Sequence, residues 1–233
     1  MNITRAIIDL SSFVVAQALS GRDPEATQVG DKRVNGADFV TYNTISRIME
    51  AVSPYGFVPN QLVLVVEGKD NKAARRSISE DYKANRGDRL QEEMEILRTS
   101  TAQVIEQFVS VGATTVTQDK VESDDVIAYL AETLEGSKMV FTTDNDLLQL
   151  SGINNTMINI KGVIDTNPYG DFPTCFIQTY KALCGDSSDG YKGVLGFGPK
   201  AFQDTYDALG FEGMKALDKM IETNRVFGMP EEW

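Results

Sequence analysis

The sequence predicts an α/β fold in which a mostly parallel central sheet is flanked by helices and followed by a smaller helical module. Three mainly apolar runs, at residues 6–9, 62–67 and 139–144, each end on an acidic residue. Continuous runs of this kind are typical of strands buried on both faces of a parallel sheet. Because strands alternate with helical patterns, we expect right-handed βαβ units over residues 1–171 and a second module over residues 172–233.

The elements between these strands follow from hydrophobic periodicity and turn signals. Residues 39–52 carry apolar side chains at helical spacing and end at a Ser-Pro-Tyr-Gly turn, which predicts an amphipathic helix. Residues 20–35 mix Gly, Asp, Pro and charge without periodicity, which predicts a loop. The remaining predicted elements are helices at 11–18, 94–108, 126–134 and 147–150, and a short strand at 111–117.

Charge and composition limit the function classes. The chain carries 22 Lys and Arg against 34 Asp and Glu, a net charge of −12, which argues against a protein that simply coats nucleic acid. It has no histidine, which excludes mechanisms built on an imidazole base and leaves oxygen ligands for hard cations. Cys175 and Cys184 lack metal-site spacing, so we expect reduced thiols in a cytoplasmic protein. No membrane span is expected, because no apolar run approaches the ~20 residues required.

Acidic residues follow the predicted strands at the points where parallel sheets place their ligand sites. Three of them, Asp9, Glu67 and Asp144, end the apolar runs; the others lie beside similar turns and are Glu122, Asp124, Asp125 and Asp146. Like charges gathered in this way repel unless cations hold them, which predicts a Mg²⁺ or Mn²⁺ site. A pair of such ions activates a water against a phosphodiester and stabilises the leaving oxygen. Taken alone, residues 122–125 also fit an ordinary acidic first turn of a helix.

One basic island, residues 69–89, interrupts the acidic sequence. Beside a metal site its Lys and Arg side chains can clamp a phosphate, and Tyr82 can stack on a terminal base. A solvated helix face is the alternative for the same charges. The candidate catalytic residues of the island are Arg75, Arg76, Tyr82, Lys83 and Arg86.

A glycine-rich segment, residues 193–200, follows two further acids, Asp186 and Asp189. It is not a Walker motif, because Pro199 stands directly after the second glycine, where the motif requires Lys. Between two helices, such glycines let backbone N–H groups approach a phosphate, although a plain tight turn is an alternative. The candidate phosphate contacts, which the resemblance described next implies are contacts with DNA, are Lys69, Lys72, Lys192, Gly193, Gly196, Gly198 and Lys200.

Six sequence blocks, taken in order, resemble a known family. The blocks are Ile8-Asp9, Val66 to Lys69, Tyr82 to Arg86, Val121 to Asp125, Thr142 to Leu147, and Gly185 to Asp189 with Gly193 to Lys200. In this order they resemble the 5′-nuclease superfamily of flap endonucleases and 5′–3′ exonucleases, especially bacteriophage and polymerase-associated bacterial members. The similarity runs from Asp9 to about Ala201.

The resemblance implies a PIN-like sheet, a helical arch within residues 69–100, and a helix–three-turn–helix module that grips duplex DNA and often holds a K⁺ ion. It implies a site for two Mg²⁺ or Mn²⁺ ions. The implied ligands of the first ion are Asp9, Glu67, Glu122 and Asp124, and those of the second are Asp125, Asp144, Asp146, Asp186 and Asp189. Lys83, with Arg75 or Arg76 and Arg86, resembles the family's clamp on the scissile phosphate.

Together these features predict a metal-dependent 5′ nuclease that cuts DNA near the junction of a 5′ single strand and a duplex, removing flaps or RNA primers during replication. We expect a monomer in a bacterial or phage-infected cell, with a replication polymerase or a single-strand-binding protein as partner. Two departures from the family pattern, Glu67 in place of Asp and Gly190 in place of Asn, leave a catalytically weakened DNA-binding protein as an alternative. A PIN-type ribonuclease is a second alternative; a phosphatase fits worse, because Ser11 stands where a second Asp belongs.

Overall fold

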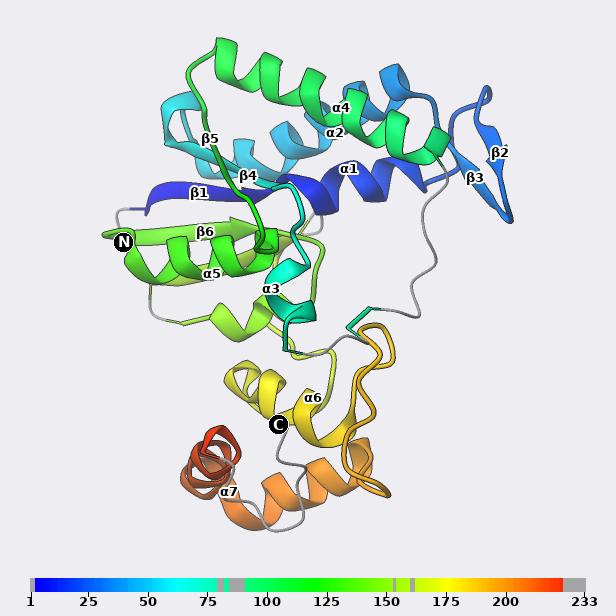
Figure 1. Cartoon of the computed structure of the whole chain (residues 1–233). Coiled ribbons are helices and arrows are strands. Elements are labelled where there is room, and N and C mark those ends of the chain that lie inside the picture. Colours follow the sequence, from blue (N-terminus) through cyan, green and yellow to red (C-terminus); the bar gives the residue numbers. More distant parts are fainter. Residues whose placement is uncertain (1–2, 79–81, 84–90, 153, 160–161, 224–233) are drawn as a thin grey trace. The chain divides into compact units, whose positions relative to one another are not determined.

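The computed structural model describes residues 3–78, 82–83, 91–152, 154–159 and 162–223 (Figure 1). The chain divides into two compact units. The first comprises residues 1–78 and 87–164, and the second comprises residues 79–86 and 165–233. The basic island therefore contributes residues to both units.

The first unit is built on a six-stranded sheet, which confirms the predicted α/β class. Its strand order is β5-β4-β1-β6-β7-β8, and all neighbouring pairs are parallel except β7 and β8. The strands are β1 Ile3–Asp9, β4 Leu62–Glu67, β5 Thr114–Gln118, β6 Ser137–Phe141, β7 Asn155–Asn159 and β8 Gly162–Val163. The strands predicted from the apolar runs, β1, β4 and β6, are direct neighbours, so their carboxyl ends meet at one edge of the sheet.

Both faces of this sheet are buried, which explains why its central strands read as continuous apolar runs. Ile8, Leu64 and Phe141 belong to one large core cluster. Alternate residues of a strand point to opposite faces. Ile7 and Val140, which are paired in register, are therefore buried on the other face and have no exposed surface.

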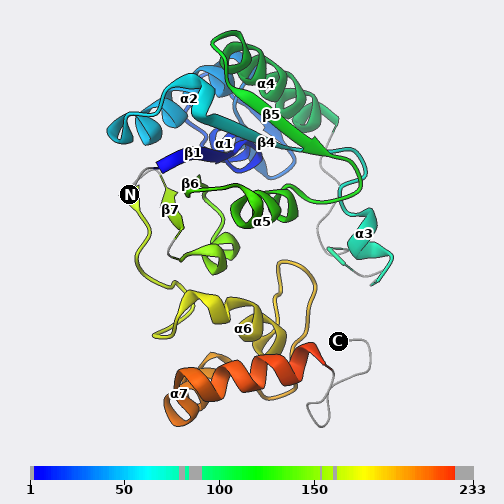
Figure 2. The ribbon, with the colours of Figure 1, turned by 90° about the vertical axis from the view of Figure 1, so that its left-hand side faces the viewer.

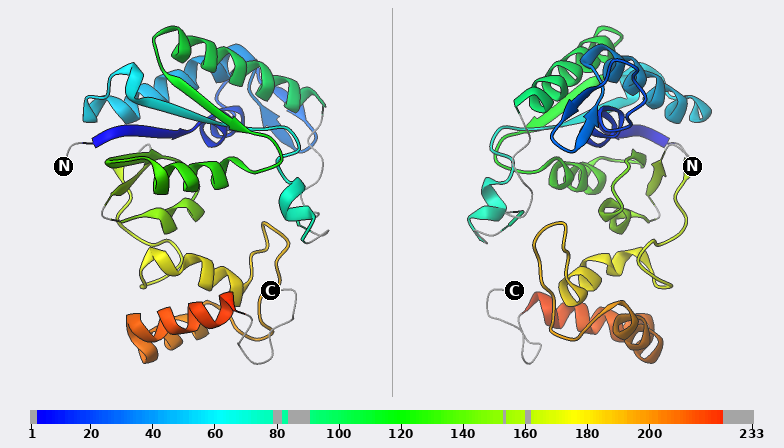
Figure 3. Two further views of the ribbon diagram at one scale, coloured as in Figure 1. Left: turned by 60° about the vertical axis from the view of Figure 1, so that its left-hand side comes forward. Right: turned by 90° about the vertical axis from the view of Figure 1, so that its right-hand side faces the viewer.

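Helices cover the two faces unequally. They are α1 Leu10–Ala18, α2 Ala37–Val52, α3 Ala73–Arg76, α4 Gln91–Ser110 and α5 Ser123–Thr133, with 3₁₀ segments η1 Ser53–Tyr55, η2 Pro59–Gln61 and η3 Asp146–Leu150. Figures 2 and 3 show α1, α2 and α4 on one face of the sheet and α5 on the other. The first group supplies Phe13, Ile48 and Val104 to the large core cluster, and α5 buries Ile127.

The prediction of a loop over residues 20–35 is wrong in part. This stretch contains an antiparallel hairpin of β2 Thr27–Val29 and β3 Lys32–Val34. Each strand has three residues and buries one apolar side chain, so it is too short to produce a detectable alternation. β7 lacks a sequence signal for a similar reason, because only Met157 and Ile158 are buried in it.

The described part of the second unit is mainly helical. It contains η4 Thr174–Phe176, α6 Ile177–Cys184 and α7 Pro199–Glu222, with a long loop between the two α-helices. Aromatic side chains form its core; the ring centroids of Phe172 and Phe202 lie 4.7 Å apart. α7 bends at Gly210, whose φ of 63° suits a residue without a side chain. Within the described ranges, no helix combines the length and the apolar character that a membrane span requires.

Candidate active site

Asp9 ends β1 at the centre of the sheet and begins the candidate site. Its Oδ1 accepts a hydrogen bond from the backbone N–H of Ser12 at 3.2 Å, so Asp9 also caps α1. Its Oδ2 accepts one from Thr142 Oγ1 at 2.8 Å, which joins the ends of β1 and β6. Burial raises the pKa of Asp9, although the bonds from Thr142 and Ser12 act to lower it. Asp9 is therefore a buried carboxyl with a fixed orientation.

Glu67 ends β4 and reaches the first turn of α5. Its Oε1 accepts a hydrogen bond from Ser123 Oγ at 3.0 Å, and its Oε2 accepts one from Asn71 Nδ2 at 2.7 Å. The longer side chain at this position thus spans from the strand end to the helix that carries Asp124. The sequence-based prediction assigns neither Ser123 nor Asn71 a contact with Glu67, although Ser123 lies inside one of its motifs.

Asp124 lies among the other acids of the site. Burial raises the pKa of Asp124 to about 7, and the charges of four other carboxylates contribute to this shift. In decreasing order of effect these carboxylates belong to Asp9, Asp144, Glu122 and Glu67. The structure therefore brings together five acids from the ends of β1 and β4, the segment after β6 and the start of α5.

Asp144 and Asp146 lie on the segment that follows β6. Thr142 Oγ1 accepts a hydrogen bond from the backbone N–H of Asp144 at 2.9 Å while it donates to Asp9. Asp144 Oδ1 in turn accepts one from the backbone N–H of Asp146 at 2.8 Å, where η3 begins. Thr142 thus positions both Asp9, at the end of β1, and Asp144, on the segment after β6. In the sequence, Thr142 is marked only by its place just before Thr143 and Asp144.

Arg75 bridges two acids at the start of α5. Its Nη1 lies 3.0 Å from Glu122 Oε2, and its Nη2 lies 2.7 Å from Asp125 Oδ1. Glu122 is the N-cap residue of α5 and is 3% exposed. Arg75 therefore contacts the acidic group directly, a pairing across 50 residues that sequence spacing does not reveal.

The donor set of these acids fits a hard divalent cation. It offers only oxygen atoms, which Mg²⁺ and Mn²⁺ prefer. A cation would also offset the repulsion and burial that raise the pKa of Asp124. In the described part of the chain, however, no three acidic or cysteine side chains are close enough together in their present conformations to hold a metal ion. The acids therefore fit a divalent ion in the type of their donor atoms and in coming together from several elements of the fold.

Asp186 belongs to the second unit, where it is paired with a lysine. Lys181 Nζ donates a hydrogen bond to Asp186 Oδ2 at 2.5 Å, and the backbone N–H of Ser188 donates to Oδ1 at 2.9 Å. Partial burial acts to raise the pKa of Asp186, but the bonds from Lys181 and Ser188 hold it below its usual value. Lys181 has no role in the sequence-based prediction.

Asp189, in the same unit, contacts the two described residues of the segment 79–86. The backbone N–H of Lys83 donates a hydrogen bond to the backbone oxygen of Asp189 at 3.0 Å, and Lys83 Nζ lies 3.8 Å from Asp189 Oδ1. The hydroxyl of Tyr82 donates to Asp189 Oδ2 at 3.3 Å. Lys83 is thus 7% exposed and fixed on an acid, while Arg86 lies outside the described residues.

The glycine-rich loop is shaped by close backbone contacts. A Cβ at Gly193, whose φ is 66°, would lie 2.4 Å from the backbone nitrogen of Gly185. Gly190 has a φ of 82°, a left-handed conformation that glycine adopts freely and that Asn tolerates better than most residues. The departure from the family pattern at Gly190 therefore keeps a residue suited to this turn.

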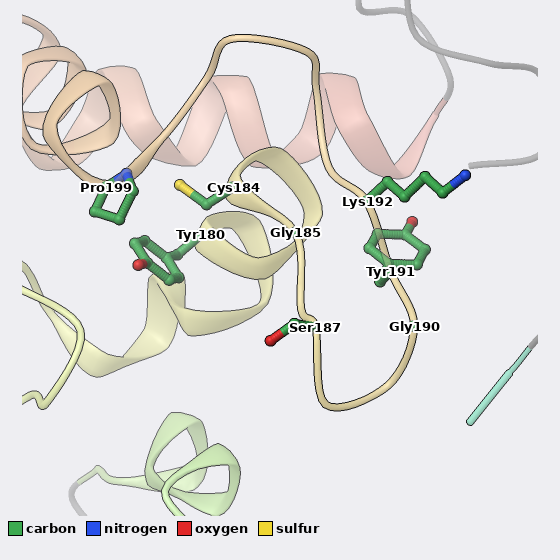
Figure 4. A pocket seen from close by; sticks show the side chains of 8 residues that line it. All are labelled: Tyr180, Cys184, Gly185, Ser187, Gly190, Tyr191, Lys192 and Pro199. Carbon is green, nitrogen blue, oxygen red and sulfur yellow. The ribbon is translucent and has the colours of Figure 1, made fainter. Parts of the chain in front are cut away.

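A cavity of about 590 Å³ lies beside this loop (Figure 4). Tyr180 and Cys184 of α6 and Pro199 of α7 line one part of it, and Tyr191 and Lys192 line another. Gly196 and Gly198 follow in the loop, and the exposed Lys200 pairs with Asp204 Oδ2 at 3.0 Å. Of the other predicted DNA contacts, Lys69 is exposed and Lys72 precedes α3. Arg76, a predicted catalytic residue, is exposed and ends α3.

Comparisons with known proteins identify the family. Residues 6–171 match the model of the 5′-3′ exonuclease N-terminal, resolvase-like domain. Flap endonuclease Xni of Shewanella woodyi is 27% identical over 207 residues, which cover 82% of this chain and 75% of that protein. The chain spans about half the length of several other relatives described as 5′-3′ exonucleases, and 24% of a matching DNA polymerase I.

Solved structures share the fold. Bacteriophage T5 5′-exonuclease with bound zinc has a TM-score of 0.64 and 17% identity, covering 98% of this chain and 82% of that one. The T5 flap endonuclease with DNA and metal ions has a TM-score of 0.60 and 16% identity, covering 98% and 80%. The fold thus defines a PIN-like α/β protein of the 5′-exonuclease type. Because the family model covers more than half of its length, the chain belongs to the 5′-3′ exonuclease family of nucleases, as the sequence resemblance predicts.

Proposed function

We propose that this chain is a divalent-metal-dependent, structure-specific 5′ nuclease that hydrolyses phosphodiesters near the junction of a 5′ single strand and duplex DNA. The observation that carries the proposal is the convergence of four carboxylates on Asp124 at the carboxyl edge of the sheet. Family membership supports the reaction class. The T5 structure with DNA and metal ions supports the substrate and the kind of cofactor.

Two Mg²⁺ or Mn²⁺ ions suit the oxygen donors of the site. The proposed ligands of the first ion are Asp9, Glu67, Glu122 and Asp124, and those of the second are Asp125, Asp144, Asp146, Asp186 and Asp189. When bound, such ions activate a water and stabilise the leaving oxygen. The chain's own part is to orient the carboxylates, since Thr142 bonds to both Asp9 and Asp144 and Ser123 bonds to Glu67.

The substrate would meet positive charge locally although the whole chain is acidic. Lys83, Arg86 and one of the arginines at 75 and 76 would contact the scissile phosphate, and Tyr82 would stack on a terminal base. The backbone N–H groups of residues 193–200 would hold a phosphate of the duplex, with a K⁺ ion at the same loop. The supporting cations are Lys69, Lys72, Lys192 and Lys200.

The proposed setting is the removal of flaps or RNA primers during replication, by a monomer in the cytoplasm of a bacterial or phage-infected cell. The match to DNA polymerase I proteins supports a replication polymerase as partner. A single-strand-binding protein is the other proposed partner.

Cleavage of a labelled 5′-flap DNA in Mg²⁺ tests the proposal, with Asp124→Asn as the test variant. The loss of cleavage activity in this variant should exceed the roughly 10–100-fold loss that is typical when a residue that only supports a metal ligand is changed. Glu50→Gln is the matched control, because it removes one negative charge from an exposed pair with Arg47 on α2. No cleavage by the unmodified chain, or equal cleavage by Asp124→Asn, would contradict the proposal.

The alternatives predict different products in the same assay. A weakened DNA-binding protein would bind forked DNA without cleaving it and without any effect of Mg²⁺. A PIN-type ribonuclease would cut RNA and would keep that activity after deletion of residues 185–200. The nuclease proposed here should lose DNA cleavage on that deletion.

A further inference from the structure

Arg75 is held in place by the backbone around it. Gly68, just after β4, lies so close to β5 that a Cβ there would be 2.0 Å from Gln118 O. Farther along, the backbone N–H of Ala74 donates to Lys120 O at 3.2 Å. Figures 1 and 3 show α3 beside the segment that leads from β5 into α5. The helix that carries Arg75 is therefore fixed to the loop that carries Glu122.

The two guanidinium contacts are made with acids that the metal site would use. Arg75 lies 3.0 Å from Glu122 and 2.7 Å from Asp125. The Glu122 side chain is only 4% exposed, so this pair is largely removed from water on the acid side. A buried carboxylate that loses its partner is strongly destabilised unless another cation replaces it. Loss of the Arg75 contact would therefore destabilise the Glu122 carboxylate, and an ion bound there would offset that loss.

Resting on the proposed function, we infer that Arg75 is a positioning residue that competes with a divalent ion for Glu122 and Asp125 and exchanges these carboxylates for a phosphate of bound DNA. A guanidinium binds carboxylate and phosphate through the same bidentate geometry. An ion that binds Glu122 or Asp125 weakens the hold of these acids on Arg75. A phosphate that binds Arg75 releases the same acids to the ion.

The coupling has a definite sign. Because linkage is reciprocal, DNA that engages Arg75 strengthens ion binding, and the ion strengthens DNA binding by the same factor. Without DNA, Arg75 lowers the affinity for the ion. The ion requirement of the chain would thus be set in part by one of its own side chains.

Calorimetric titration with Mn²⁺ or Ca²⁺ in the absence of DNA measures the competition directly. Arg75→Gln should bind the ion more tightly, within the roughly 5–150-fold range typical of linked sites. Arg75→Lys should lie between this variant and the unmodified chain, since a lysine keeps the charge but not the two-pronged contact. Arg47→Gln is the matched control for ion binding, because it removes one arginine charge from an ion pair with Glu50 on α2 and Arg47 has no proposed role in the site.

A second measurement separates this role from a purely structural one. In flap cleavage at DNA concentrations well below KM, where most of the chain is free of DNA, Arg75→Gln should lower the half-saturating Mg²⁺ concentration. The same variant should raise the KM for DNA, a split that general misfolding does not produce. Ion affinity of Arg75→Gln and Arg75→Lys equal to or weaker than that of the unmodified chain would overturn the inference. Failure of the unmodified chain to bind any divalent ion would instead overturn the proposed function.

Discussion

Asp124 shows most directly how single residues determine this site. Its carboxyl group is partly withdrawn from water and is repelled by four neighbours, and its pKa rises from 3.8 to about 7. Every one of these acids could be named from the sequence, because each follows an apolar run or precedes a helical one. Their hydrogen-bond partners could not, because Thr142 lies 133 positions from Asp9 and bonds through a common hydroxyl side chain.

Asp124→Asn should stabilise the metal-free protein at alkaline pH. In the folded state the carboxyl keeps its proton to about pH 7, whereas in the unfolded chain it loses the proton near pH 3.8. The folded state therefore binds more protons over this range, and its stability falls as pH rises. Asn removes this component, so the Tm advantage of the variant in EDTA should grow from pH 5 to pH 8.

Thermal unfolding of both proteins in EDTA across this pH range checks the sign. Added Mg²⁺ should raise the Tm of the unmodified chain more than that of Asp124→Asn, since the ion relieves the same repulsion. Parallel Tm curves for the two proteins in EDTA would refute the prediction.

At the scale of elements, the strands and helices that the sequence predicts are those that are long or that have a continuous or periodic run of apolar residues. β1, β4 and β6 were evident because both of their faces are buried, and α2 because its apolar residues repeat over 16 positions. The hairpin β2–β3 and strand β7 were not, because pairing with neighbours rather than their own composition makes them strands. The contact of α3 with the β5–α5 loop depends on the tertiary fold and has no local signal.

Gly68→Ala tests the close approach between the turn after β4 and β5. The added Cβ would lie 2.0 Å from Gln118 O, so one backbone segment must move. Overpacking of this kind lowers the free energy of unfolding by about 1–3 kcal/mol. Gly152→Ala is the control, because a Cβ there meets no atom within 4 Å. Urea unfolding measures both, and equal midpoints for the two variants would contradict the prediction.

At the scale of the whole molecule, the proposed DNA binding has to be reconciled with an acidic chain, and it would require a small number of basic side chains. The net charge is −12, so the proposed DNA binding would depend on local groups, such as the proposed contact loop around residues 193–200, rather than on the mean field. The family and fold were predictable from six ordered motifs. The sequence does not predict which basic side chains pair with which acids, such as Lys181 with Asp186, because each ion pair depends on side-chain conformation.

Lys200→Gln should reduce the salt dependence of DNA binding. Each phosphate contact contributes about 0.9 to the slope of log K against log salt concentration, so the loss of one contact should lower the slope by about that amount. Lys215→Gln is the control, because Lys215 is exposed on the same helix, beside Glu212, and is not a predicted contact. Binding isotherms for a flap duplex in EDTA at several salt concentrations measure the slopes. An unchanged slope for Lys200→Gln would show that this lysine does not touch the DNA.

The central position of β1 in the sheet affects how the chain folds during its synthesis on the ribosome. β1 is synthesised first but sits between two strands made later; Ala6 pairs with Leu62, and Ile7 pairs with Val140. Pairing over such sequence distances slows folding and leaves an apolar strand open in the growing polypeptide. Asp9 can meet Asp144 only once β6 has been translated and docked. The proposed metal site can therefore form only after the ribosome has translated the chain past β6.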